Sequence, residues 1–155
     1  MKKKVAVLFG GRSVEHEVSV ITGAQVMENI DKEKYDVVPI YIDKEGKWFT
    51  GDSLKEFENF KNSNLNTNDH NLYLHPESIG LFKKKILDGI DIIFPTIHGT
   101  NGEDGTIQGL FELMNIPYVG GGVLASSVGM DKILMKDVFK SNGLPIVDYL
   151  WFYRS

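Results

Sequence analysis

The segment Val5-Ala6-Val7-Leu8-Phe9-Gly10-Gly11 decides the fold, because a continuous apolar run is closed here by two glycines. A short apolar run that ends at a turn signal is typical of a strand buried on both faces of a parallel sheet. Two parallel strands need a crossover between them, which is usually a helix. We therefore expect a helix directly after the glycines and a second strand beyond it.

The residues after Gly11 supply both expected elements. Ser13 is a candidate helix cap, and apolar residues then recur at helical spacing and predict a buried stripe: Val14, Val18, Ile21, Ala24 and Met27. A second strand is predicted over 35–42, where Pro39 indicates an edge position or a bulge. Strand, helix and strand in this order make a βαβ unit. The sequence therefore predicts an α/β fold: an open parallel sheet with helices on both faces.

Residues 43–86 carry a weaker pattern than the segments on either side. Residues 44–51 predict a small hairpin at a sheet edge, and the asparagine-rich stretch 62–71 predicts a loop. We interpret this region as an insertion into one domain and not as a domain boundary.

The α/β pattern returns at residues 90–97, where Pro95 is expected near the end of a strand. A helix is predicted next from apolar residues at the i, i+3, i+4 and i+7 positions, namely Ile107, Leu110, Phe111 and Met114. The remaining elements are predicted in this order: a short strand at 118–119, a helix at 123–128, a helix capped by Asp131 and ended by Asn142-Gly143, and a strand at 146–152 that leaves the domain.

Length, charge and residue usage narrow the class of protein. A chain of 155 residues suggests one domain with a sizeable core. The net charge of −4 opposes nucleic-acid binding, which needs a clustered basic surface. The absence of cysteine excludes disulfides and thiolate chemistry. No apolar run reaches the length of a signal-peptide core or a membrane span, so we expect a cytoplasmic protein without nucleic-acid or membrane partners.

The first candidate for chemistry is the loop at 10–15, because open α/β sheets bind ligands beyond the carboxyl ends of their strands. This loop lacks the third glycine and the spacing of a dinucleotide-binding turn, which makes a Rossmann cofactor site a poor interpretation. Glu15 would repel a phosphate and would suit an ammonium group. From this loop alone, a favourable first-turn charge worth roughly 0.3–1 kcal/mol is the simpler explanation of Glu15.

The loop at 98–105 is expected on the same edge of the sheet as the first. Its glycines permit close approach of a ligand, and His98 is placed to donate to a carboxylate or a phosphate. A purely structural His98 is equally compatible with the sequence. Glu103 and Asp104 are expected to cap the next helix, because adjacent carboxylates rarely both face one metal ion.

Lys132 is the third candidate, since it lies in the first turn of its predicted helix, where the helix dipole disfavours a cation. Such a placement fits recruitment by a polyphosphate, and it also fits simple exposure, which the segment by itself favours. The glycines at 120–122 lack the lysine spacing of a P-loop and are therefore only a weak indication of phosphate binding.

Taken together, these segments resemble the D-alanine–D-alanine ligase family of the ATP-grasp superfamily, from Val5 to about Pro145. The most specific part is His98-Gly99-x-x-Gly102-Glu103-Asp104-Gly105-x-Ile107-Gln108-Gly109, which fits the first family signature at every fixed position. The opening motif fits Gly10-Gly11-x-Ser13-x-Glu15-x-Glu17-Val18-Ser19, and the Met-Asp-Lys element of the family fits residues 130–132.

The resemblance implies a role for each candidate residue. Glu15 is expected to hold the amino group of the first D-alanine, and His98 to lie near the carboxylate of that substrate. Lys132 is expected to reach the phosphates of ATP. In such enzymes ATP phosphorylates the first D-alanine, and the amine of the second attacks the acyl phosphate to give D-alanyl-D-alanine for peptidoglycan synthesis.

The resemblance also implies a division of labour along a longer chain. Residues 1–145 are expected to form a Rossmann-like pre-ATP-grasp domain on the substrate side, and residues 146–155 to begin a linker to a central ATP-grasp domain. Mg²⁺ and most of the ATP would be bound outside this chain, with no metal ligand within it. We therefore expect no ligase activity from the chain alone, and a homodimer is expected from the family. A ligase for D-alanyl-D-lactate or D-alanyl-D-serine and a non-catalytic binding or dimerisation module are the alternatives.

Overall fold

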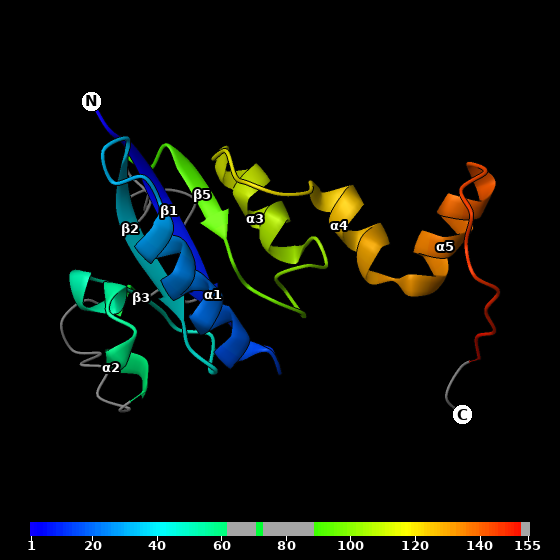
Figure 1. Ribbon diagram of the computed structural model, residues 1–155, viewed down its shortest axis with the longest axis horizontal. Helices are drawn as coiled ribbons and strands as arrows, with labels where there is room; N and C mark the ends of the chain where they lie inside the picture. The colour runs from blue at the N-terminus through cyan, green and yellow to red at the C-terminus, as the bar shows by residue number, and fades with distance from the viewer. Residues whose placement is uncertain (62–70, 73–88, 153–155) are drawn as a thin grey trace.

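The computed structural model describes residues 1–61, 71–72 and 89–152 (Figure 1). Its centre is a five-stranded sheet in the order β4-β3-β2-β1-β5. The strands β1 (Lys3–Gly10), β2 (Tyr35–Ile42) and β5 (Ile92–Pro95) run parallel. The predicted parallel sheet is therefore confirmed, and β5 ends at Pro95 as expected.

Two short antiparallel strands extend the sheet on the β2 side. β3 (Trp48–Thr50) folds back on β2, which confirms the predicted hairpin, and β4 (Asn71–Leu72) pairs with β3. The short elements η1 (Asp52–Lys55) and α2 (Glu58–Lys61) follow β3. Most of the predicted loop at 62–71 lies outside the described residues.

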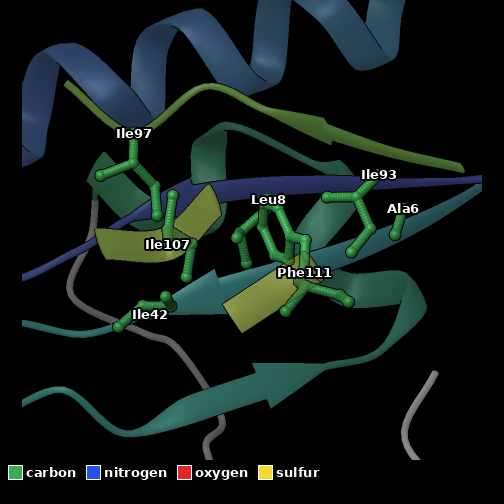
Figure 2. Close-up of a cluster of buried hydrophobic side chains, with 8 residues drawn as sticks. Ala6, Leu8, Ile42, Ile93, Ile97, Ile107 and Phe111 are labelled. Atoms are coloured by element: carbon green, nitrogen blue, oxygen red, sulfur yellow. The ribbon is translucent and has the colours of Figure 1, made fainter. Parts of the chain in front are cut away.

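The two faces of the sheet are covered by different helices, as the sequence predicted. α1 (His16–Asn29) packs on one face and α3 (Thr106–Met114) on the other (Figure 1). The β1 side chains alternate between the two faces, as strand geometry requires. The core on the α3 side contains eight buried residues, seven of which are labelled in Figure 2: Ala6, Leu8, Ile40, Ile42, Ile93, Ile97, Ile107 and Phe111.

The core on the α1 side combines residues from β1, β2, α1 and the hairpin region. Its buried members are Val5, Val7, Phe9, Val20, Met27, Tyr41, Phe49 and Leu54. Phe9 and Tyr41 stack at a centroid distance of 5.5 Å, and Phe60 meets both rings edge-on. This aromatic group connects the carboxyl ends of β1 and β2 to α2.

The buried stripe predicted for α1 is wrong over its first half. Val14, Val18 and Ile21 are exposed, and the helix instead buries a different set: His16, Ser19, Val20, Gly23 and Met27. The reason is close packing, because a Cβ atom on Gly23 would lie only 2.6 Å from the Phe9 Cβ. Small residues therefore face the sheet here, and larger apolar residues face away from it.

Three local expectations also need revision. The Ser13 hydroxyl accepts from the Glu15 N–H in the turn before α1, so Ser13 does not cap the helix itself. Pro39 lies inside β2, in register with Val7. The Pro39 carbonyl accepts from the Thr50 hydroxyl and therefore points toward β3, just beyond the last β2–β3 pair. An N–H on the same residue would point to the same side, where no strand residue is paired with it, so its absence costs no sheet hydrogen bond. Residues 146–152 form no strand.

The last part of the chain extends away from the sheet. Residues 117–119 add a short parallel bridge, since Ile93 bonds to Pro117 and Val119 and pairs with Tyr118. α4 (Val123–Met130) then packs near α3, and α5 (Lys132–Ser141) packs on α4 (Figure 1). The Asp131 side chain accepts from the N–H groups of Ile133 and Leu134, which confirms the predicted cap.

Candidate functional site

The loops after β1 and β5 are joined at the carboxyl edge of the sheet by one buried hydroxyl. The Ser19 Oγ accepts from the Gly10 N–H at 2.8 Å and donates to the Thr96 carbonyl at 2.7 Å. Ser19 is fully buried, so this bridge is shielded from water. The two loops that carry Glu15 and His98 are therefore held at a fixed separation.

His16 supports the first loop from beneath, a role that its sequence position did not indicate. Its Nδ1 lies 2.7 Å from the Gly11 carbonyl, so Nδ1 carries the donated proton. Its Nε2 lies 3.1 Å from the Tyr41 hydroxyl. Burial raises the pKa of Tyr41 to about 12, so this hydroxyl keeps its proton and is able to donate it to Nε2. Because its ring is buried, His16 is a structural residue of the loop and not a ligand-binding one.

Glu15 meets the second loop at Gly99. A Cβ atom on Gly99 would lie 2.6 Å from the Glu15 Oε2 and 2.8 Å from the Ser13 Oγ, so these side chains touch the backbone next to His98. Gly99 also has a φ of +70°, which favours glycine. Among the described residues the exposed Glu15 carboxylate has no ion pair or hydrogen bond, so its charge is available to a ligand.

His98 is held between a hydroxyl and a carboxylate. Its Nε2 lies 3.0 Å from the Thr22 Oγ1 on α1, and its Nδ1 lies 3.6 Å from the Glu103 Oε1. The second oxygen of Glu103 accepts from the Gly99 N–H at 3.1 Å. The His98 side chain is 32% exposed, so an approaching ligand is able to reach the ring.

The rest of the second loop is fixed by its own polar groups. Burial opposes ionisation of Asp104, but hydrogen bonds from the Asn101 and Thr106 N–H groups lower its pKa overall. Because Thr106 is the first residue of α3, the predicted capping role is confirmed for Asp104. The buried Gln108 amide donates to the Gly102 carbonyl at 2.8 Å and holds the loop from the α3 side.

Lys132 is not brought to Glu15 and His98. It lies at the start of α5, on the far side of α4 from the sheet (Figure 1). α4 itself is tied to the second loop, because the Ser127 Oγ lies 2.8 Å from the Asp104 carbonyl. The exposed Lys132 ammonium donates to the Gly129 carbonyl at 3.1 Å, and it pairs with no carboxylate among the described residues.

A metal ion has no ready ligand set in the described part of the chain. Residues 1–61, 71–72 and 89–152 contain no group of three or more His, Asp or Glu side chains arranged to hold an ion. The residues around His98 therefore do not fit a magnesium ion on their own. No helix in the same ranges has the length and apolar character needed to cross a membrane.

These features define a class: an open α/β domain whose candidate site lies at the carboxyl ends of two neighbouring parallel strands. In this candidate site an exposed carboxylate, Glu15, contacts the glycine next to an imidazole, His98. The family profile described as "D-ala D-ala ligase N-terminus" matches residues 4–121. The chain therefore belongs to the D-alanine–D-alanine ligase family, in its amino-terminal region.

Individual relatives agree with this assignment. A D-alanine–D-alanine ligase from Geobacillus kaustophilus is 48% identical over 97% of this chain, which spans 42% of that relative. The VanG D-Ala:D-Ser ligase from Enterococcus faecalis has a TM-score of 0.75 at 35% identity, with 92% of this chain and 43% of that chain covered. A D-alanine–D-alanine ligase from Bacillus anthracis complexed with ATP has a TM-score of 0.58 at 30% identity, with 91% and 36% covered. The chain thus spans about two fifths of the length of these relatives.

Proposed function

We propose that this chain is the amino-terminal, substrate-side part of an ATP-dependent D-alanine–D-alanine ligase, occupying residues 1–145 and followed by a linker at 146–155. The observation that carries the proposal is the contact of the Glu15 carboxylate with Gly99, the residue next to His98. A zwitterionic amino acid needs an anion for its amine and a donor for its carboxylate, and these two side chains offer that pair at one edge of the sheet.

Glu15 is proposed to bind the ammonium group of the first D-alanine. Its carboxylate is exposed and has no partner among the described residues. Ser13 lies beside it at Gly99 and supplies a hydroxyl for the same amine. A charge-assisted hydrogen bond of this kind contributes about 1.5–3 kcal/mol to binding.

His98 is proposed to stabilise the negative charge on the carboxyl group of the same substrate. The carbonyl oxygen of the acyl phosphate gains negative charge again when the amine of the second D-alanine attacks it, so a fixed imidazole donor assists both binding and reaction. The structure positions the imidazole through Thr22 on one side and Glu103 on the other. Substrate held at both ends is oriented for attack by the amine of the second D-alanine.

Lys132 is proposed to bind the phosphates of ATP. Its support is an exposed ammonium without a carboxylate partner among the described residues, together with the ATP-bound relative from Bacillus anthracis. Since Lys132 lies apart from Glu15 and His98, ATP would meet the substrate at a site completed by other parts of the ligase. Magnesium would neutralise phosphate charge there, with ligands other than the described carboxylates.

Homodimerisation, a cytoplasmic location and a part in peptidoglycan synthesis complete the proposal. The D-Ala:D-Ser relative makes D-alanyl-D-serine the second candidate product. The curated relative at higher identity is named D-alanine–D-alanine ligase, which favours the dipeptide of D-alanine.

The test joins this chain to the remaining part of the Geobacillus kaustophilus ligase and measures ADP release that depends on D-alanine. We expect activity from the chimera and none from the chain alone. Robust ADP release by the chain alone would contradict the assignment of most ATP contacts elsewhere. A folded but inactive chimera would favour a non-catalytic module, and activity only with D-serine or D-lactate as second substrate would identify the alternative products.

Glu15→Gln in the chimera tests the proposed substrate contact. We expect kcat/KM for D-alanine to fall about 10²-fold, because the lost interaction is a charge-assisted hydrogen bond. Glu28→Gln is the matched control, since Glu28 is an exposed glutamate at the other end of α1. Equal loss in both variants would show that Glu15 acts only through α1 stability or net charge.

A further inference from the structure

The contacts of His98 specify where its protons lie. The Thr22 Oγ1 is 3.0 Å from the Val18 carbonyl, four residues earlier on α1, and 3.0 Å from the His98 Nε2. A carbonyl only accepts, and a threonine hydroxyl has one proton to donate. If that proton serves Val18, the hydroxyl oxygen is free to accept, and both contacts are satisfied only when Nε2 carries a proton.

The other ring nitrogen faces a negative charge. Nδ1 lies 3.6 Å from the Glu103 Oε1, too far for a hydrogen bond but close enough for an ion pair. A bare lone pair on Nδ1 would be repelled by this oxygen, whereas a proton there would be attracted. Glu103 is itself anchored, because its Oε2 accepts from the Gly99 N–H. The Glu15 carboxylate, beside Gly99, is the other charged group of the site.

We propose that Thr22 is a positioning residue for His98: its hydroxyl accepts the Nε2 proton, and this hydrogen bond sets both the tautomer and the orientation of the ring that meets the substrate. This inference rests on the proposed function and adds a residue to it.

Thr22 determines both the orientation of the His98 ring and the nitrogen that carries its proton. The bond from Nε2 to α1 fixes the ring plane, because Thr22 is half-buried on a helix that packs against β1. Without the Thr22 acceptor, a neutral His98 would place its single proton on Nδ1, toward Glu103, and Nε2 would be bare.

The test reads the ring nitrogens of His98 directly, in the 155-residue chain. Nitrogen-15 chemical shifts distinguish a protonated ring nitrogen from a bare one. The chain has four histidines, and a His98→Gln spectrum assigns the signals of His98. At about pH 8.5, where an ordinary imidazole is neutral, we expect the wild-type His98 to carry its proton on Nε2.

Thr22→Val removes the acceptor with little change in shape, and Thr22→Ser retains it. We expect the His98 proton to move to Nδ1 in Thr22→Val and to stay on Nε2 in Thr22→Ser. Thr50→Val is the matched control, because the Thr50 hydroxyl also donates to a main-chain carbonyl but lies on β3. A proton on Nδ1 in the wild type, or an unchanged pattern in Thr22→Val, would overturn the proposal.

Kinetics of the chimera give an independent reading. We expect Thr22→Val to lower kcat about ten- to hundredfold, because a misplaced donor loses transition-state contact, while Thr22→Ser restores most of it. An inactive wild-type chimera would count against the ligase function and would leave the nitrogen spectra to decide the role of Thr22. If Thr22→Val unfolds, Thr22→Ala with its own spectrum supplies the same comparison.

Discussion

Gly99 is the residue on which the candidate site depends most directly, because its missing side chain is what lets Glu15 and Ser13 approach the backbone beside His98. The motif at 98–109 predicted His98 and its loop correctly as part of one edge of the sheet. It did not predict Thr22, since a threonine on a helix becomes a neighbour of His98 only through packing of α1 on the sheet. His16 was missed for the same reason.

Gly99→Ala is expected to lower both the stability of the protein and the activity of the chimera. A left-handed conformation strains any residue with a Cβ by about 1–2 kcal/mol, so the free energy of unfolding in urea should fall by that amount. The new methyl group would also displace the Glu15 carboxylate, so activity of the chimera should fall sharply.

Gly143→Ala is the control for this strain. Gly143 has a φ of +72°, close to the +70° of Gly99, and no atom lies within 4 Å of the place that a methyl group would take there. We expect a similar loss of stability with unchanged activity. Equal activity of the Gly99→Ala and Gly143→Ala chimeras would contradict the proposed contact between Glu15 and the ligand.

α1 shows how far an element can be predicted from periodicity. The helix lies where the sequence placed it, yet the first half of the predicted apolar stripe points away from the sheet, and only its last member, Met27, is buried in the core. Hydrophobic spacing assumes that the largest apolar residues face the core. Here the β1 aromatic residue Phe9 fills the space, so only a small residue fits opposite. β1 and β5 were predicted more reliably, because both are short apolar runs and β1 is buried on both faces from Val5 onward.

Gly23→Ala tests this packing of α1 on β1. Alanine favours a helix over glycine, but its Cβ would meet the Phe9 ring at 2.7 Å. We expect a net loss of about 1–3 kcal/mol in the free energy of unfolding, as overpacked cores show. Gly109→Ala on α3 has nothing within 4 Å of the new atom and should stabilise by about 0.5–1 kcal/mol. A stabilised Gly23→Ala variant would contradict the close contact.

The distal part of the protein, α4, α5 and residues 144–152, differs from the sheet domain in its exposure. Large apolar side chains are open to solvent along it: Leu124, Leu134, Leu144, Val147, Leu150, Trp151 and Phe152. The sequence predicted a helix at 123–128, where α4 forms, and a helix capped by Asp131, which is α5, but it also predicted a strand at 146–152 that does not form. Apolar content alone does not make a strand, which needs a neighbour to supply its hydrogen bonds.

Exposed apolar surface of this kind favours association. We therefore expect the purified chain to be a dimer at micromolar concentration, as proposed for the family member. Light scattering measures the mass directly, against a monomer of 17.4 kDa. A monomeric mass across the micromolar range would reject the dimer.

The Ser19 bridge has a consequence for selectivity. The Ser19 hydroxyl accepts from the Gly10 N–H and donates to the Thr96 carbonyl. Movement of either loop away from Ser19 would therefore leave a buried polar group without a hydrogen bond. Under the proposed substrate contacts, the main chain therefore sets the separation of Glu15 and His98. We expect an amino acid with a different spacing between its amine and its carboxylate to contact only one of these two side chains, so that the site selects its substrate by length before the reaction.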